Sequence, residues 1–184
     1  MERVYYLEAL NNLHGLLRDN KDIINIPGKG IIGFHPTLLP YGRGPAPIIN
    51  TILNGLSESG ITMFYITESL DDGDIIAQER FSIKATDHAE DIYNKVIGSG
   101  RKLVRKYFPL IIDGKAPGFP QDVSRAGVFK KPSLNDNRID FQKEPLEKIY
   151  KKIKALSMPY KGAYIEKGNK RLIIWRAELQ DTDG

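Results

Sequence analysis

One histidine and one short acidic cluster stand next to apolar runs of this chain. His35 directly follows the apolar residues 31–34, and the cluster Asp71-Asp72-Gly73-Asp74 directly precedes the run that begins at Ile75. Side chains at strand ends can meet at one edge of a sheet. A carboxylate beside an imidazole holds one ring tautomer and favours its protonated form, which suits a proton shuttle or a general base. A loop histidine bonded to backbone beside an ordinary turn aspartate would have the same spacing, so both interpretations stay open.

The residues that follow His35 cannot form regular structure. Five prolines and glycines, Pro36, Pro40, Gly42, Gly44 and Pro45, interrupt residues 36–46. Long shaped loops of this kind in compact domains are often functional. Pro47 is suited to the first position of a helix, and the apolar spacing predicts that this helix ends at Asn54-Gly55.

The elements around this loop indicate an α/β protein. Residues 31–34 are apolar throughout, which is typical of a parallel strand covered on both faces. Strands over 61–66 and 75–83, joined by the loop 67–73, are expected to form a hairpin. Asp87 with Glu90 is a capping box that opens a long helix ending at Gly114, and His88 in its first turn is expected to be exposed.

Further elements lie at the two ends of the chain. Leucine spacing predicts an amphipathic helix over 4–17. A second helix begins at Glu144-Pro145, and a hairpin around 167–169 carries Trp175 on its second strand. We expect a core over 1–114, a linker or crossing segment over 115–140, and a C-terminal helix and β-hairpin subdomain over 141–184.

The composition is that of a soluble globular protein. The chain has 184 residues, 41% hydrophobic and 27% charged, with a net charge of +4 and no cysteine. Disulfides, thiolate zinc sites and cysteine nucleophiles are therefore excluded. No stretch is typical of a signal peptide or membrane span, which predicts a cytoplasmic protein with no membrane partner. The late lysines have no aromatic stacking motif beside them, so they indicate a solvated helix face rather than a nucleic-acid patch.

A series of motifs in fixed order resembles a known superfamily. They are His-Pro-Thr-Leu-Leu-Pro at 35–40, Arg43-Gly44, Pro47, Asn54-Gly55, Gly60-Ile61-Thr62 and Leu-Asp-Asp-Gly-Asp-Ile-Ile at 70–76. This order is similar to the folate-dependent formyltransferases, which include enzymes acting on methionyl-tRNA, glycinamide ribonucleotide and amino-sugar nucleotides. Later segments, among them Arg-Ile-Asp-Phe at 138–141 and Ile-Trp-Arg-Ala at 174–177, resemble the tRNA and sugar-nucleotide branches.

The resemblance implies a fold and an activity. The fold is α/β, with a partial Rossmann-like catalytic core, shortened at the front, and a small helix-plus-hairpin appendage. The activity is transfer of a formyl group from the co-substrate 10-formyltetrahydrofolate to a primary amine, either of an amino-sugar nucleotide or of methionyl-tRNA. The amino-sugar nucleotide is favoured because the chain ends soon after Trp175. Two alternatives are a catalytically impaired remnant that serves as a binding or oligomerisation module, and a hydrolase that passes the formyl group to water.

The resemblance also implies roles for the catalytic positions. His35 matches the family histidine that acts as base on the attacking amine, and Asp71 matches the aspartate that holds the imidazole. Gly33 occupies the position of the family asparagine, which donates to the oxyanion. Loss of one such donor costs about 10²–10³ in rate. Gly33→Asn is therefore expected to raise the rate, and Asp74 is expected to be structural.

The other positions implied by the resemblance bind the two substrates. Ile66, Leu70 and Asp71 are expected to contact the folate. Thr37 and Arg43 are expected to face the acceptor, although Arg43 alternatively pins its own loop. No metal is implied, and a homo-oligomer is left open.

Overall fold

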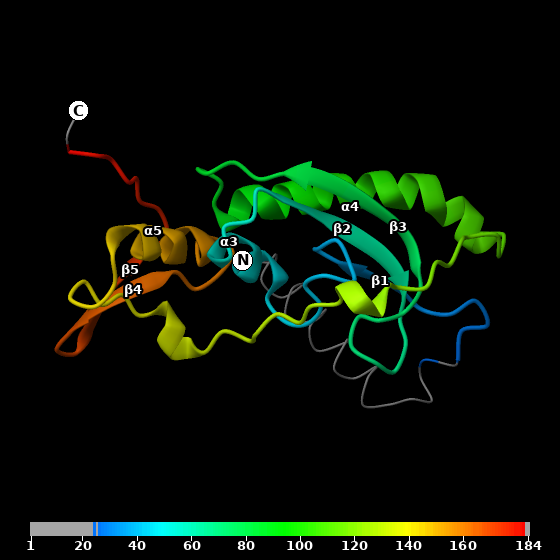
Figure 1. The fold of residues 1–184 in the computed structure, drawn as a ribbon, viewed down its shortest axis with the longest axis horizontal. Coiled ribbons are helices and arrows are strands. Elements are labelled where there is room, and N and C mark those ends of the chain that lie inside the picture. The colour runs from blue at the N-terminus through cyan, green and yellow to red at the C-terminus, as the bar shows by residue number, and fades with distance from the viewer. Residues whose placement is uncertain (1–23, 25, 183–184) are drawn as a thin grey trace.

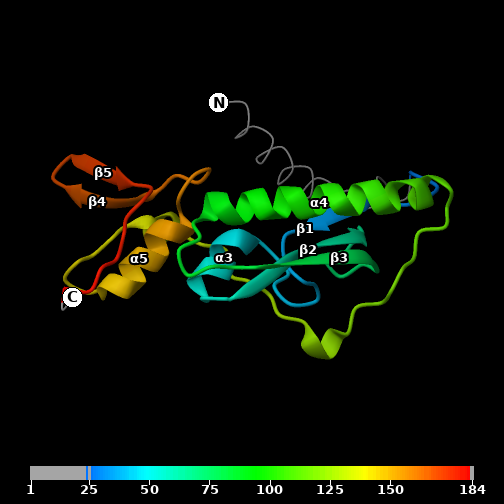
Figure 2. The same ribbon diagram turned by 90° about the horizontal axis from the view of Figure 1, so that it is seen from above.

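The protein consists of a small sheet beside a long helix, with a helix and a hairpin at one end (Figure 1). The computed structural model describes residue 24 and residues 26–182, so the helix expected over 4–17 lies outside the described residues. The long helix lies along the sheet, and the C-terminal helix and hairpin lie beyond its first turns (Figure 2). Within the described residues no helix is long and apolar enough to cross a membrane.

The sheet has the strand order β1-β2-β3. It consists of β1 (Ile32–His35), β2 (Glu58–Tyr65) and β3 (Ile75–Ser82), and both pairs are antiparallel. The hairpin formed by β2 and β3 is confirmed. The prediction that the first strand is parallel and covered on both faces is wrong for the described residues, because β1 pairs antiparallel with β2 and Phe34 is 44% exposed. An apolar run shows that a strand can be buried, but it carries no information on the direction of its neighbour.

The loop after β1 leads into α3 (Pro47–Leu53), a short helix with proline in its first turn, as expected. The fold is a mixed α/β arrangement, but the described part of the sheet is only partly Rossmann-like because it contains no parallel pair of strands.

The long helix α4 (Ala89–Ile112) covers one face of the sheet, where Ile61 and Met63 of β2 form a core with Leu103. Successive residues of a strand point to opposite faces, so Thr62 and Phe64 point away from α4. His35 is paired with Thr62 in the sheet register. Directly paired residues share a face, so the side chain of His35 lies on the face opposite α4.

The start of α4 differs from the prediction by one residue. His88 is the N-cap, and its backbone N–H donates to Asp91 Oδ2 at 2.9 Å. Asp87, the expected cap, instead accepts the backbone N–H of Lys84 at 2.8 Å and pairs with Lys95. The capping box is therefore present in another register, because the Asp87 carboxylate is used by the preceding turn. His88 is also buried rather than exposed.

The C-terminal part contains α5 (Leu146–Ala155) and a hairpin of β4 (Ala163–Lys167) and β5 (Lys170–Ile174), which confirms the expected helix and hairpin. Trp175 lies just beyond the second strand rather than on it. Two short 3-10 helices, η1 (Val123–Arg125) and η2 (Leu134–Asn137), lie in the segment that leads there. Isoleucines of α3, α4 and α5 share one hydrophobic core. The division into 1–114, 115–140 and 141–184 stays a prediction.

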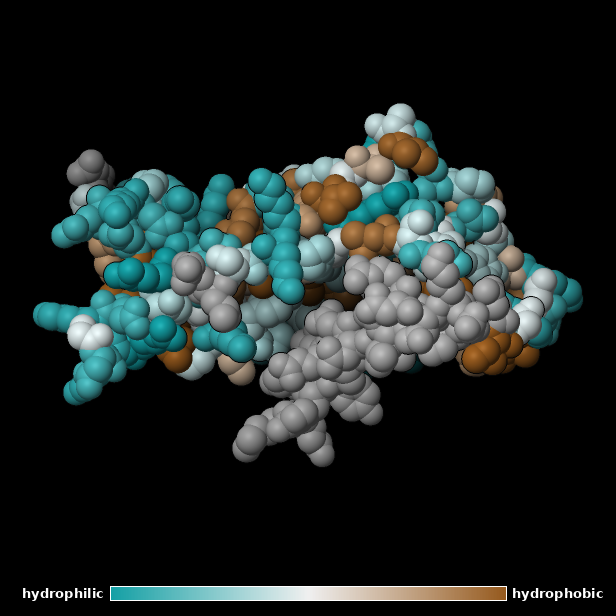
Figure 3. Space-filling model, turned by 90° about the horizontal axis from the view of Figure 1, so that it is seen from below, coloured by the Kyte–Doolittle hydropathy of each residue, from teal (hydrophilic) through white to brown (hydrophobic). Residues whose placement is uncertain are grey.

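A mostly buried ion pair, with both side chains 11% exposed, connects α5 to the segment before it. Lys152 Nζ donates to both carboxylate oxygens of Glu144, at 2.8 and 2.7 Å, and to the backbone oxygen of Arg138. Burial by itself raises the pKa of Glu144, but the hydrogen bonds from Lys152 and from the Asp140 N–H outweigh it and lower that pKa. The end of the molecule that carries these elements is mostly hydrophilic in the view of Figure 3. Lys143, Lys148 and Lys151 are exposed, as expected for a solvated lysine face, but Lys152 and Lys154 are buried.

Candidate active site

The structure brings the two halves of the predicted pair together. His35 is the last residue of β1, and Asp71 lies in the loop between β2 and β3. His35 Nδ1 lies 3.5 Å from Asp71 Oδ2, and the two residues are only 7% and 4% exposed. The same Oδ2 accepts the backbone N–H of Gly44 at 2.8 Å. The acidic loop and the glycine-rich loop after His35 therefore meet at this carboxylate.

The other ring nitrogen of His35 faces a second oxygen. Nε2 lies 2.7 Å from the backbone oxygen of Gly42. A carbonyl oxygen can only accept, so Nε2 is the donor of this bond. Nδ1 meanwhile faces a carboxylate, which is also an acceptor. The doubly protonated imidazolium satisfies both neighbours, so this geometry suits a ring that donates a proton or stabilises negative charge.

Polar side chains of the sheet brace the loop that follows His35. Thr62 Oγ1 donates to the backbone oxygen of Thr37 at 2.7 Å, and Gln78 Nε2 donates to that of Leu39 at 2.8 Å. Thr37 itself is buried, with Oγ1 3.4 Å from the oxygen of Gly42 that also accepts from His35. The loop thus has a defined shape although it contains no regular structure.

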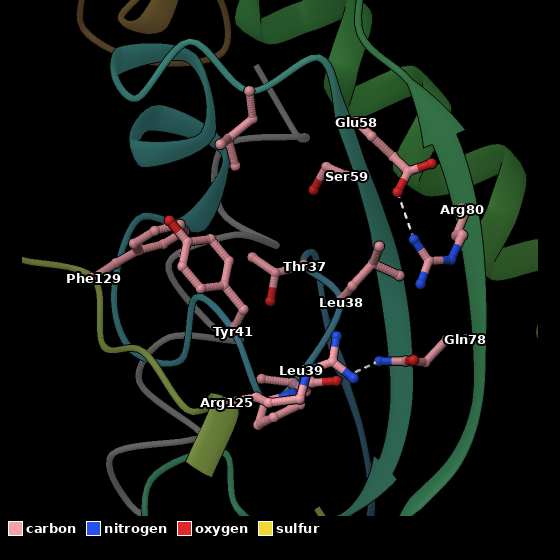
Figure 4. A pocket seen from close by; sticks show the side chains of 12 residues that line it. Thr37, Leu38, Leu39, Tyr41, Glu58, Ser59, Gln78, Arg80, Arg125 and Phe129 are labelled. Carbon is pink, nitrogen blue, oxygen red and sulfur yellow. Dashed lines mark hydrogen bonds and ion pairs between the residues drawn. The ribbon is translucent and has the colours of Figure 1, made fainter. Parts of the chain in front are cut away.

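A cavity of about 240 Å³ is lined in part by residues 37–41 of this loop. Figure 4 shows side chains from the loop, from β2 and β3 and from the later crossing segment around the same hollow; among them are Thr37, Tyr41, Ser59, Gln78, Arg125 and Phe129. Neither His35 nor Asp71 lines it. A second, open cavity of about 510 Å³ lies at the acidic loop, lined by Tyr65, Thr67, Glu68, Ser69, Asp72, Gly73 and Asp74.

Arg43 connects the two loops through a residue that the sequence did not indicate. Its Nε and Nη2 donate to Gln121 Oε1 at 3.1 and 2.7 Å. Gln121 Nε2 in turn donates to the backbone oxygens of Asp71 and Gly73, at 2.9 and 2.8 Å. A lone glutamine in a Pro- and Gly-rich crossing segment gives no signal of such a role. Arg43 therefore holds more than its own loop, because it also reaches the acidic loop through Gln121.

The remaining predicted positions lie beside the pair. A Cβ on Gly33 would come within 2.9 Å of both Ile66 Cγ1 and Phe64 Cε1, so the aromatic ring packs over the glycine. Leu70 packs against Gly44, because a Cβ added to Gly44 would lie 3.7 Å from Leu70 Cδ2. Asp74 is exposed. Among the described residues no group of three or more His, Cys, Asp or Glu side chains could hold a metal ion.

The packing at Gly33 changes the expectation for Gly33→Asn. The new side chain must displace the Phe64 ring, and overpacking of this kind costs about 1–3 kcal/mol. We therefore expect the single variant to lose stability without the rate gain that a restored donor would otherwise bring. The double variant Gly33→Asn/Phe64→Ala should recover activity relative to Phe64→Ala alone. Thermal unfolding and steady-state rates of the three variants test this, and a faster single variant of unchanged stability would contradict it.

Comparison with known proteins places the chain in a family. The model described as "Formyl transferase" matches residues 20–106, and that described as "Formyl transferase, C-terminal domain" matches residues 132–184. A methionyl-tRNA formyltransferase of Moorella thermoacetica is 33% identical over 162 residues, which are 88% of this chain and 51% of that protein. The chain spans about half the length of the curated relatives it matches.

Solved structures agree with this assignment. The methionyl-tRNA formyltransferase of Clostridium thermocellum is 27% identical with a TM-score of 0.68, over 83% of this chain and 64% of that one. The N-formyltransferase of Helicobacter canadensis, in complex with folinic acid and dTDP-3-aminofucose, is 30% identical with a TM-score of 0.61, over 68% of this chain and 46% of that one. Since both domain models match in order and together cover most of its length, the chain belongs to the formyltransferase family.

Proposed function

We propose that this chain transfers a formyl group from 10-formyltetrahydrofolate to a primary amine. The observation that carries the proposal is the buried pair of His35 and Asp71, with Nδ1 3.5 Å from Oδ2 where two loops meet. Family membership supports the reaction class. The open cavity of about 510 Å³ beside the acidic loop supports a small-molecule ligand, since such sites usually measure about 300–1,000 Å³.

The reaction needs a group that moves protons. The amine forms a C–N bond to the formyl carbon, whose oxygen becomes an oxyanion, and a proton must leave the nitrogen. N10 of the folate gains a proton as the bond between it and the formyl carbon breaks. His35 in its protonated form stabilises the oxyanion and supplies the proton to N10, and it then takes one from the amine. Asp71 orients the ring throughout and stabilises its protonated form.

The geometry adds one requirement to this scheme. His35 Nε2 donates to the Gly42 oxygen at 2.7 Å, so the ring must release that oxygen before Nε2 can meet a substrate. Apo structures often hold catalytic hydrogen bonds in a form that changes when substrate binds. Binding of the amine beside Gly42 would provide this exchange.

Two acceptor classes are proposed, an amino sugar carried on a nucleotide and methionyl-tRNA. The Helicobacter canadensis structure contains dTDP-3-aminofucose and supports the first, and the Moorella thermoacetica relative is a methionyl-tRNA formyltransferase and supports the second. A dimer or larger oligomer of the chain and a location in the cytoplasm remain part of the proposal.

A second candidate function is a binding or oligomerisation module without catalysis. It is favoured by Gly33, which carries no side chain to donate to an oxyanion and which the Phe64 ring covers. Retention of a buried His35–Asp71 pair opposes it, since a binding module has no need of a proton-transfer pair.

Calorimetric titration with folinic acid separates these candidates. Saturable binding is expected, and no heat up to millimolar ligand would exclude the enzyme assignment for this chain by itself. Formyl transfer is then measured side by side with a dTDP-amino sugar and with methionyl-tRNA. Binding of folinic acid without transfer to either acceptor would favour the binding module.

A further inference from the structure

Gln121 makes four hydrogen bonds with two loops that meet at the candidate active site. Its Oε1 accepts from Nε and Nη2 of Arg43, at 3.1 and 2.7 Å. Its Nε2 donates to the backbone oxygens of Asp71 and Gly73, at 2.9 and 2.8 Å. The bonds use both hydrogens of the amide nitrogen, so the side chain has one geometry that satisfies all of them.

Glutamine is the side chain that this position requires. The guanidinium of Arg43 offers only donors, and the two backbone oxygens offer only acceptors. An amide presents an acceptor on one side and a donor of two hydrogens on the other. Glutamate could still accept from Arg43, but it would place carboxylate oxygens against the oxygens of Asp71 and Gly73. Methionine has a similar length and would make none of the four bonds.

The backbone that Gln121 holds is strained. Asp71 has φ +50°, in the left-handed region that residues other than glycine rarely adopt. Aspartate adopts this conformation more readily than most residues, but it is still less favourable than the ordinary helical and extended regions and needs neighbouring bonds to hold it. The Asp71 carboxylate must nevertheless stay near His35 Nδ1 while it accepts from Gly44 N. Gln121 donates to the backbone oxygens of Asp71 and Gly73, and these two bonds restrain the backbone of Asp71.

We propose that Gln121 is a positioning residue for the formyltransferase reaction: it clamps the Asp71–Gly73 backbone and so aims the Asp71 carboxylate at His35. Arg43 completes the clamp from the opposite loop, because it fixes the rotamer of the Gln121 amide. This inference deepens the proposed function and rests on it. It assigns to the crossing segment a role in the geometry of the site that no motif of that segment indicates.

The position of the carboxylate can be measured without any assay of activity. The Gly44 amide donates to Asp71 Oδ2, so its hydrogen exchange reports whether the carboxylate is in place. Two amides nearby serve as internal controls, because Arg43 N donates to the oxygen of Gly127 and Phe129 N to that of Arg43, both at 2.8 Å. These control bonds do not involve the acidic loop.

Exchange is compared by NMR in the wild-type chain, Gln121→Met, Gln121→Glu and the exposed control Gln142→Met. Both Gln121 variants are expected to raise Gly44 exchange about tenfold or more, with the Arg43 and Phe129 amides unchanged. An unchanged Gly44 amide overturns the proposal. So does a parallel rise of all three amides, which would indicate general loosening. If Gly44 exchange rose in Gln121→Met but not in Gln121→Glu, the lost bond to Arg43 would explain the effect, since glutamate can still accept from Arg43. This result would overturn the proposed role of the bonds to the two backbone oxygens.

Catalysis gives the second measurement. Misplacement of a catalytic group by about 1 Å can cost about 10² in rate, so kcat of both Gln121 variants should fall about 10- to 100-fold. Folinic acid affinity should fall by much less than kcat, because Gly73 is the one lining residue of the cavity at the acidic loop whose backbone oxygen Gln121 holds. Both constants in Gln142→Met should stay within about twofold of wild type. A loss of affinity in proportion to kcat would indicate a structural role and count against the proposal. If the wild-type chain neither binds folinic acid nor transfers formyl, the proposed function fails, while the exchange result still decides whether the clamp exists.

Discussion

Formyl transfer by Asp71→Asn is expected to fall by about 10³–10⁴-fold, with the fold retained. In the wild-type chain the Gly44 N–H donates to Asp71 Oδ2 at 2.8 Å. Asparagine keeps an oxygen that can accept this hydrogen bond, so we expect the loop to keep its position. It removes the negative charge 3.5 Å from His35 Nδ1, and with it the counter-ion of the protonated ring. The rate is measured as kcat/KM for the acceptor, and the melting temperature checks the fold.

The neighbouring carboxylate provides the matched control. Asp72 accepts from Thr67 Oγ1 at 2.5 Å, away from the histidine. Asp72→Asn removes the same charge one residue further on. Because Asp72 lines the open cavity at the acidic loop, the control compares kcat alone, which should stay within about twofold of wild type. The reverse pattern, an inactive Asp72→Asn beside an active Asp71→Asn, would move the carboxylate role to Asp72 and contradict the role given to Asp71.

Gly73→Ala is expected to have the second largest effect, because it should displace the loop that carries Asp71. A Cβ at Gly73 would lie 1.8 Å from the backbone oxygen of Tyr65 and 2.9 Å from Thr67 Cγ2. A backbone oxygen within a sheet cannot move aside, so the loop must shift instead. We expect a loss of about 2–4 kcal/mol in the free energy of unfolding and a fall of at least about 10²-fold in kcat.

Gly98→Ala is the control for this substitution. Gly98 lies inside α4, and apart from the backbone of that helix and the neighbouring residues nothing lies within 4 Å of where its Cβ would be. Alanine there should stabilise the protein by about 0.5–1 kcal/mol, because glycine is a poor helix former, and should leave the rate unchanged. Denaturant unfolding and steady-state rates of the two variants are compared. A Gly73→Ala protein of normal stability and rate would show that the acidic loop tolerates the displacement.

The elements of the fold could largely be predicted because their signals are local. Pro47 at the start of α3, the turn before Asp74 and the apolar spacing of α4 each depend on neighbours a few residues away. The direction of β1 could not be predicted, since pairing is decided by a partner distant in sequence. The capping box of α4 lies one residue later than the sequence predicts, because the Asp87 carboxylate is bound by the Lys84 N–H and by Lys95.

For the candidate site, residue types and their order predicted which side chains carry the chemistry. The sequence points to His35 and Asp71 as the reacting pair, because the histidine follows one apolar run, the aspartate precedes another, and both stand in order among the surrounding motifs. These signals lie in the chemistry of the residues themselves. Whether the two side chains meet, and at what distance, depends on the register that pairs His35 with Thr62 and on the loop that returns Asp71 to Gly44.

The tertiary structure alone decided how the pair is held. Gln121 lies 50 positions from Asp71 and 78 from Arg43, and one glutamine has no spacing that predicts two such partners. The close approach of Phe64 to Gly33, and of Tyr65 to Gly73, likewise follows from the pairing of strands and the path of a loop. The sequence by itself therefore predicted the reaction class and the pair His35 and Asp71, because these predictions depend on residue types and their order along the chain. The orientation of those residues was decided by contacts between distant segments, because only folding brings their atoms within bonding distance.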